Sequence, residues 1–181
     1  MSAGLESSSF AKAYEVFQAA HPETTLDTLR HSGVESFNRL GLPTRRLEER
    51  RYTNLKTIAN SEFKITDNKG LSFENTEALP GLDAYKVTLV DGVFQSCSDD
   101  MPEGLSVLPL AQGQSLASDT LGKLVVAEDA MTALNSAFLE AGVVIHVAKG
   151  IAVAKPLHLD WVASEGHENV ALNPRIVVVL E

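Results

Sequence analysis

Apolar residues recur every three or four positions near the start of the chain, which is the period of one face of a helix. Pro22 ends this pattern, because a proline disfavours helical geometry in the residue before it. The pattern predicts a helix over about residues 5–20. Its buried face is expected to contain Phe10, Ala13, Tyr14, Phe17 and Ala20.

A second helical pattern follows and predicts a helix over about residues 25–40. Thr24 or Thr25 can cap its first turn with a hydroxyl oxygen. Gly41 and Pro43 then form a stop signal, because glycine adopts the left-handed cap and proline cannot continue the helix. The expected buried face is Leu26, Leu29, Gly33, Phe37 and Leu40.

The middle of the chain predicts a β-hairpin over about residues 86–96. Asp91-Gly92 separates two apolar runs, and this dipeptide favours the positive φ angles of a tight hairpin turn. Leu105–Leu108 is expected to form another strand, and Leu110 to about Ala117 a short helix. Residues 56–84 are expected to be irregular, with one or two short strands or helical turns.

A third helix is predicted over about residues 128–141, with acidic residues at its start and Gly142 as its cap. Beyond it the sequence is rich in β-branched residues and turns. This pattern is typical of a sandwich or of the first coils of a β-helix, and periodicity alone does not choose between them. The predicted strands are Val143–Val147, Ile151–Ala154, Leu157–Ala163 and Ile176–Leu180.

The last predicted strand runs directly into the final residue, Glu181. An apolar strand with no partner beyond it is an exposed edge, which favours aggregation. We therefore expect the sequence to be interrupted rather than finished at this point.

Composition indicates an ordinary globular protein, since 44% of the 181 residues are apolar and 22% are charged. The net charge of −9 is uneven: residues 1–56 carry +1 and residues 57–181 carry −10. Such a chain is a poor candidate for binding nucleic acid. It shows neither a secretion signal nor an apolar run of membrane-spanning length, so we expect a cytoplasmic protein without a membrane partner.

A metal site is the first chemical hypothesis. His146 and His158 lie in predicted strands, and neighbouring β-helix coils could bring them together with Cys97, the single cysteine. Their spacing matches no ligand pattern, and Cys97 has neither a paired cysteine nor an evident base. The sequence therefore favours ordinary strand residues at all three positions.

Paired carboxylates are the second hypothesis. Adjacent acids such as Glu48-Glu49 and Asp99-Asp100 do not converge on one site, so solvated charges are the better interpretation. A carbohydrate-active β-helix enzyme would need clustered carboxylates on one strand face. Asp160, Glu165 and Glu168 show no such convergence. With no Walker motif, dinucleotide loop or nucleophile elbow, we predict no catalytic, cofactor-binding or metal-binding residue.

The segment Arg45–Arg51 contains four arginines and two glutamates. Two interpretations are open: an internal salt-bridged turn, which the sequence favours, and a surface that binds an anionic partner.

Several motifs resemble the N-terminal part of the SufB/SufD family of the SUF iron–sulfur cluster assembly system, and are most similar to its SufD branch. The longest is the run Gly41–Leu55, similar to the family pattern Gly-x-Pro-Thr-Arg-basic-x-Glu-x-Trp-basic-Tyr-Thr-x-Leu. Arg50 stands where that pattern has Trp, and Asn173 stands for the His of a His-Pro-Arg turn. The other similar segments, in family order, are Val87–Phe94, Met101–Leu108, Ala133–Phe138, Pro156–Leu159 and Asn173–Arg175.

The resemblance implies an α+β fold: an N-terminal mixed domain at 1–141 leading into the first coils of a right-handed parallel β-helix at 142–181. It implies a scaffold subunit without catalysis of its own, acting with SufB and the SufC ATPase. An iron–sulfur cluster, or a flavin, would belong to the whole complex, since most docking regions lie outside these residues. The alternative is a stand-alone anion- or protein-binding module that uses the Arg45–Arg51 segment.

Overall fold

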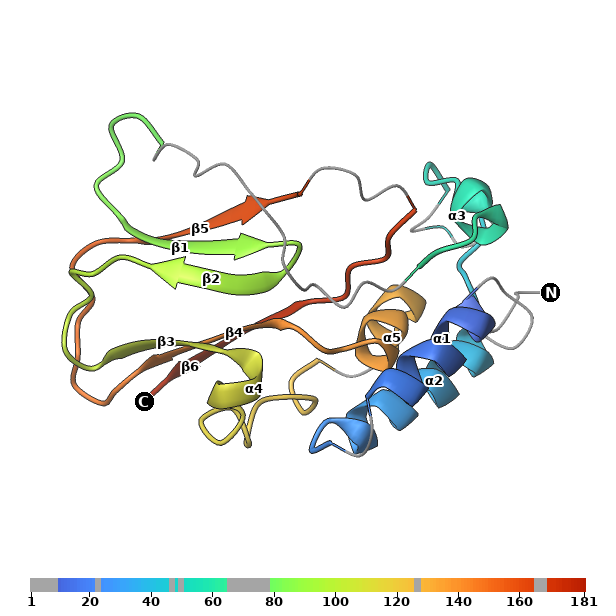
Figure 1. The fold of residues 1–181 in the computed structure, drawn as a ribbon, viewed down its shortest axis with the longest axis horizontal. Coiled ribbons are helices and arrows are strands. Elements are labelled where there is room, and N and C mark those ends of the chain that lie inside the picture. The colour runs from blue at the N-terminus through green and yellow to red at the C-terminus, as the bar shows by residue number, and fades with distance from the viewer. Residues whose placement is uncertain are drawn as a thin grey trace. The chain divides into compact units, whose positions relative to one another are not determined.

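The computed structural model describes residues 10–21, 24–45, 48, 51–64, 79–125, 128–164 and 169–181. Contacts divide the chain into two compact units, each assembled from separate segments (Figure 1). The helical unit comprises residues 1–66, 124–139 and 168–173, and the strand unit comprises residues 67–123, 140–167 and 174–181. The predicted boundary between residues 141 and 142 remains a prediction.

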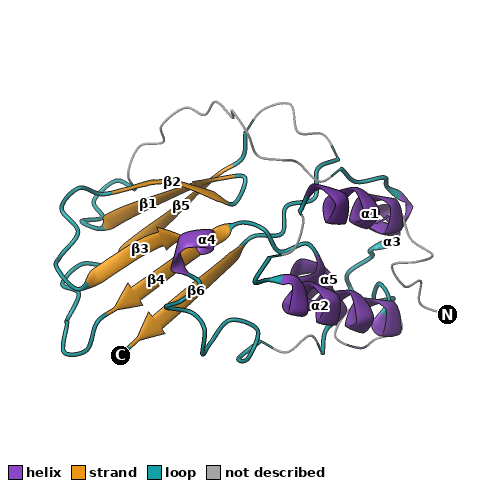
Figure 2. Cartoon of the chain, turned by 60° about the horizontal axis from the view of Figure 1, so that its bottom comes forward, coloured by secondary structure: helices purple, strands orange, loops and turns teal. Residues whose placement is uncertain are grey.

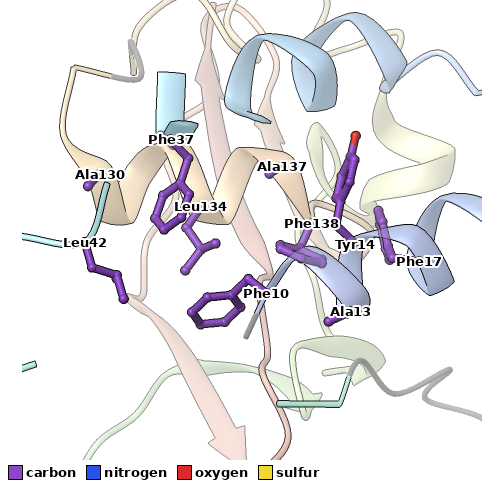
Figure 3. Packing of buried hydrophobic residues seen from close by; sticks show 11 residues of the cluster. Phe10, Ala13, Tyr14, Phe17, Phe37, Leu42, Ala130, Leu134, Ala137 and Phe138 are labelled. Carbon is purple, nitrogen blue, oxygen red and sulfur yellow. The ribbon is translucent and has the colours of Figure 1, made fainter. Parts of the chain in front are cut away.

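The helical unit contains α1 (Phe10–Ala20), α2 (Asp27–Leu40), α3 (Lys56–Asn60) and α5 (Ala130–Ala137). The first two confirm predicted helices, although residues 5–9 lie outside the described residues. An aromatic cluster fills the unit, with Tyr14 edge-on to Phe138 at 5.5 Å between ring centroids (Figure 3). The buried members are Phe10, Ala13, Tyr14, Phe17, Phe37, Leu42, Ala130, Ala133, Leu134, Ala137 and Phe138.

Helix α2 packs closely against α5 because Gly33 lacks a side chain. A Cβ atom at this position would lie 2.5 Å from the backbone nitrogen of Ala137 and 2.8 Å from the carbonyl oxygen of Ala133. At the far end of α2, Gly41 has a φ angle of 63° and donates its N–H to Phe37 O at 2.7 Å. The predicted glycine stop is therefore confirmed.

Helix α5 is shorter than the predicted 128–141. The Asp129 carboxylate caps it by accepting from the Met131 and Thr132 backbone N–H groups, and Phe138 already leaves the helix. The prediction that Gly142 caps this helix was wrong, because Gly142 begins the next strand. Its Cβ would collide with Arg175 on the neighbouring strand.

The strand unit contains two three-stranded sheets of mixed direction, in the orders β2-β1-β5 and β3-β4-β6. Figure 2 shows them as two layers. In each sheet the central strand has one antiparallel and one parallel partner. The bounds are β1 (Tyr85–Val90), β2 (Val93–Cys97), β3 (Leu105–Pro109), β4 (Gly142–Val147), β5 (Leu157–Val162) and β6 (Arg175–Leu180), with a short α4 (Leu110–Gly113) after β3.

One apolar core lies between the two sheets. Because side chains alternate along a strand, every second residue of each central strand points into this core. The buried members are Tyr85, Val87 and Leu89 from β1, Leu105 from β3, and Val143 and Ile145 from β4.

The Asp91-Gly92 turn is confirmed, since both residues have positive φ angles, 48° and 84°. The predicted strand Ile151–Ala154 was wrong. This segment leaves β4 in one sheet and reaches β5 in the other, and it pairs with no strand among the described residues. Helix α4 stops earlier than the predicted Ala117. The mixed α+β class is confirmed, and the described residues show two small sheets rather than a parallel β-helix as such.

Candidate functional site

The described part of the Arg45–Arg51 segment forms an exposed loop before α3. Arg45 Nε donates to the Arg51 carbonyl oxygen at 3.2 Å. The Arg51 guanidinium lies 4.6 Å from the centre of the Tyr52 ring, a cation–π contact. Tyr52 itself is 85% exposed. Arg46, Leu47, Glu49 and Arg50 lie outside the described residues.

The prediction of a salt-bridged turn falls largely on Arg46, Glu49 and Arg50, which lie outside the described residues. Within those described residues, neither Arg45 nor Arg51 has a carboxylate at ion-pair distance, although Glu48 is only three residues from Arg51. The two side chains are held by a backbone carbonyl and an aromatic ring instead. Lys56, exposed at the start of α3, likewise has no ion pair within the described part of the chain.

The structure does not bring His146, His158 and Cys97 together. His146 follows the buried Ile145 on β4, and His158 lies between Leu157 and Leu159, which pack against the core from β5. Alternation therefore places the two histidines on the outer faces of different sheets. Cys97 packs against the core between the sheets. The described residues contain no group of three or more metal-ligating side chains placed to hold a metal ion.

His146 contacts a carboxylate instead of another histidine. Its Nε2 atom lies 3.2 Å from Glu181 Oε1, and this interaction lowers the pKa of the Glu181 carboxyl group. The contact joins β4 to the residue that follows β6.

The candidate acids are also dispersed. Asp160 on β5 pairs with Lys86 on β1 at 3.1 Å, while Glu165 and Glu168 lie outside the described residues. Asp100 lies in an exposed turn, 3.7 Å from the Lys155 ammonium group, and Asp99 beside it is exposed. The Lys155 contact is an ordinary surface ion pair, whereas the Lys86 and Asp160 side chains are only 21% and 14% exposed.

Sequence reasoning missed a buried cation, Arg30, which is 5% exposed. Its Nε donates to Leu139 O at 2.9 Å, and its Nη1 donates to Thr24 Oγ1 and to Asp27 Oδ1 at 3.0 and 3.2 Å. The guanidinium also lies 5.0 Å from the centre of the Phe17 ring. The signal was the position of Arg30 four residues after Leu26 and seven before Phe37, on the apolar face of α2.

A cavity of about 190 Å³ lies beside Arg30, between the end of α1 and the start of α2. Hydrogen bonds from Thr24 N, and from the Thr24 hydroxyl and Arg30, lower the pKa of Asp27 in this cavity. Arg30 and Asp27 form an ion pair with each other, and Arg30 also contacts Phe17 and Leu139. Their role is therefore to hold α1, α2 and the end of α5 together. The lining residues are Tyr14, Phe17, Gln18, His21, Asp27, Arg30 and His31.

The helices of the described residues are all too short or too polar to cross a membrane.

A comparison with curated proteins finds no match. The family model described as "SufBD protein N-terminal region" matches residues 7–159, from before α1 to within β5. This match covers most of the 181 residues and indicates a role in SUF iron–sulfur cluster assembly. The chain therefore belongs to the SufB/SufD family, whose N-terminal region it contains.

Proposed function

We propose that the chain is the SufD-type scaffold subunit of a SUF complex, acting with a SufB subunit and a SufC ATPase and performing no catalysis of its own. The observation that carries this proposal is the family match over residues 7–159. The proposal includes a cytoplasmic location, which rests on the family alone.

The choice of SufD over SufB rests on the run Gly41–Leu55. Its Pro43-Thr44-Arg45 core and its Tyr52-Thr53-x-Leu55 end are similar to the SufD signature. Arg50 stands where that signature has a tryptophan.

The path of the chain through the two sheets supports a β-helix beginning in the strand unit. The chain passes from β4 in one sheet to β5 in the other, and returns to place β6 beside β4. Strands β4 and β6 pair in parallel from Gly142 with Arg175 to Val147 with Leu180. Strand β5 pairs in parallel with β1 over its whole length. One such circuit is the repeating element of a parallel coil.

We propose that this chain holds no cofactor of its own and that a cluster, or a flavin, is bound only by the assembled complex. The dispersion of His146, His158 and Cys97 supports this view, because no two of them share a face.

A second candidate function is a module that binds an anionic or protein partner through the Arg45–Arg51 segment. The observation that favours it is the loop geometry, in which Arg45 and Arg51 make no described ion pair and Tyr52 is exposed. This function is compatible with a scaffold.

Deletion of the gene tests the scaffold role. In cells that depend on the SUF system, we expect iron–sulfur enzymes such as aconitase to lose activity while their polypeptides remain present. Restoring the gene should restore activity, and added SufC ATPase alone should not. Unchanged aconitase activity in the deletion strain would remove the proposed role.

A further inference from the structure

The loop between α2 and α3 carries an exposed aromatic residue with cations around it. Residues 51–54 are all exposed, and Tyr52 is 85% exposed. The Arg51 guanidinium packs over the Tyr52 ring in a cation–π contact, with 4.6 Å between its Cζ atom and the ring centroid. A tyrosine this open contributes little to the stability of the helical unit, since its ring is removed from water mainly by a neighbouring arginine.

The cations of this loop are positioned before any partner arrives. Arg45 is anchored on the Arg51 carbonyl oxygen at 3.2 Å, and Arg51 is anchored on the Tyr52 ring. Asn54 Oδ1 accepts from the Lys56 backbone N–H at 3.1 Å and so fixes the start of α3. Restricting these side chains in advance lowers the entropy that binding would otherwise cost.

These three cations lack carboxylate partners in the described residues, in a chain whose net charge is −9. Elsewhere in the described chain, the exposed Lys123 and the half-buried Lys155 do pair with aspartates. The described cations of this loop outnumber its one described carboxylate, Glu48, so the loop is a local positive surface that an acidic partner would complement.

We infer that Arg45, Arg51, Lys56 and Tyr52 form a docking surface for an acidic segment of a partner protein. Arginine and tyrosine are the residue types that most often dominate the energy of protein interfaces. The acidic remainder of the chain opposes the long-range approach of a nucleic-acid backbone, whereas a short acidic peptide meets only the local surface. The choice of a protein as the partner rests on the proposed scaffold role, and the rest of the inference does not depend on that role.

Fluorescence anisotropy with a short labelled poly-glutamate peptide tests this surface. We expect binding at low ionic strength that weakens as salt is added, because the contact is electrostatic. Arg51→Glu and Arg45→Glu should each weaken binding by about tenfold, since each replaces an attraction by a repulsion. Tyr52→Ala should weaken it by about threefold, while Tyr52→Phe should leave it nearly unchanged, because the ring and its arginine contact remain.

Lys149→Glu is the matched control, because it makes the same charge change at an exposed turn of the strand unit. It should change the affinity by less than about twofold. Each variant should keep the unfolding midpoint of the parent, which shows that the loop changes leave the fold intact.

Three results would overturn the inference: no peptide binding at low salt, equal weakening by Lys149→Glu and Arg51→Glu, or tighter binding of a single-stranded oligonucleotide than of the peptide. The last result would reassign the surface to nucleic acid. Failure of the SUF role would be seen separately, as undiminished aconitase activity in the deletion strain with the peptide result unchanged.

Discussion

The two units of this chain stabilise themselves in different ways. The helical unit closes around an aromatic core and buries a charged residue, Arg30, with every described contact of its guanidinium made inside the unit. The strand unit has a core between its sheets, but each sheet has two edge strands, β2 and β5 in one and β3 and β6 in the other. The helical unit thus buries its charge with its own side chains, whereas the edge strands of the strand unit have one strand partner each among the described residues.

The inner face of β6 shows this difference most clearly. Val178 and Leu180 pair with Ile145 and Val147, whose side chains face the core, yet they are 52% and 73% exposed. Their apolar surface gains little from burial here. The comparison predicts that truncation to alanine will cost much more in the helical unit than on β6.

Phe138→Ala should have the largest effect. The Phe138 ring is 2% exposed and contacts the rings of Tyr14 and Phe17. Its loss should lower the free energy of unfolding by about 3–5 kcal/mol, from lost burial and the cavity left behind. Urea unfolding followed by circular dichroism measures this cost. Val178→Ala is the counterpart on β6 and should cost less than about 1 kcal/mol. Equal costs for the two variants would contradict the comparison.

Arg30→Met should be the next most damaging change. It keeps most of the buried length of the side chain but leaves Leu139 O without its donor and Asp27 without its cation. Breaking one partner of such a buried network should cost about 2–4 kcal/mol. Arg39→Met, at an exposed position of the same helix, is the control and should cost under about 0.5 kcal/mol. If the two variants unfold alike, Arg30 does not join the helices as described.

Acid should weaken the helical unit through Asp27. Its pKa in the folded chain lies below the ordinary value of 3.8, so its stabilising contribution is present above that pH and is lost as the pH falls through the lower folded value. Unfolding at a series of pH values should therefore show a loss of stability below about pH 4. Asp27→Asn should be less stable at neutral pH and should show a smaller loss in acid. An identical acid slope in the variant would exclude Asp27 as the cause.

Val178→Lys should have the smallest effect on stability and the clearest effect on association. A charge on the exposed inner face of an edge strand opposes pairing with another chain. Light scattering at increasing protein concentration should show less self-association than in the parent, with the unfolding midpoint nearly unchanged. Lys123→Ala, which removes an exposed charge at a residue outside β6, should not reduce association.

The helices and the hairpin could be predicted because their signals are local. Gly41 ends α2 and Asp91-Gly92 forms the hairpin turn through their own backbone preferences. The predicted strand Ile151–Ala154 failed for the opposite reason, since a β-branched run becomes a strand only where another strand lies beside it. No local sequence pattern indicates that residues 151–154 cross from one sheet to the other.

In the candidate site, too, local signals could be predicted from the sequence and long-range contacts could not. Sequence analysis found the Arg45–Arg51 segment because the charges adjoin, but it could not tell a salt-bridged turn from an open one. The contacts described for its cations are the Arg51 carbonyl oxygen, which accepts from Arg45, and the Tyr52 ring, which lies against Arg51. Arg30 was missed because its acceptor Leu139 lies 109 residues away in sequence.

Native purification tests the central claim most directly. The chain, tagged at its own gene, would be isolated under gentle conditions and its companions identified by mass spectrometry and quantified. A SufD-type scaffold predicts that a separate SufB subunit and the SufC ATPase co-purify in fixed ratios. Isolation of the chain without either subunit, from cells that contain both, would contradict the proposed function.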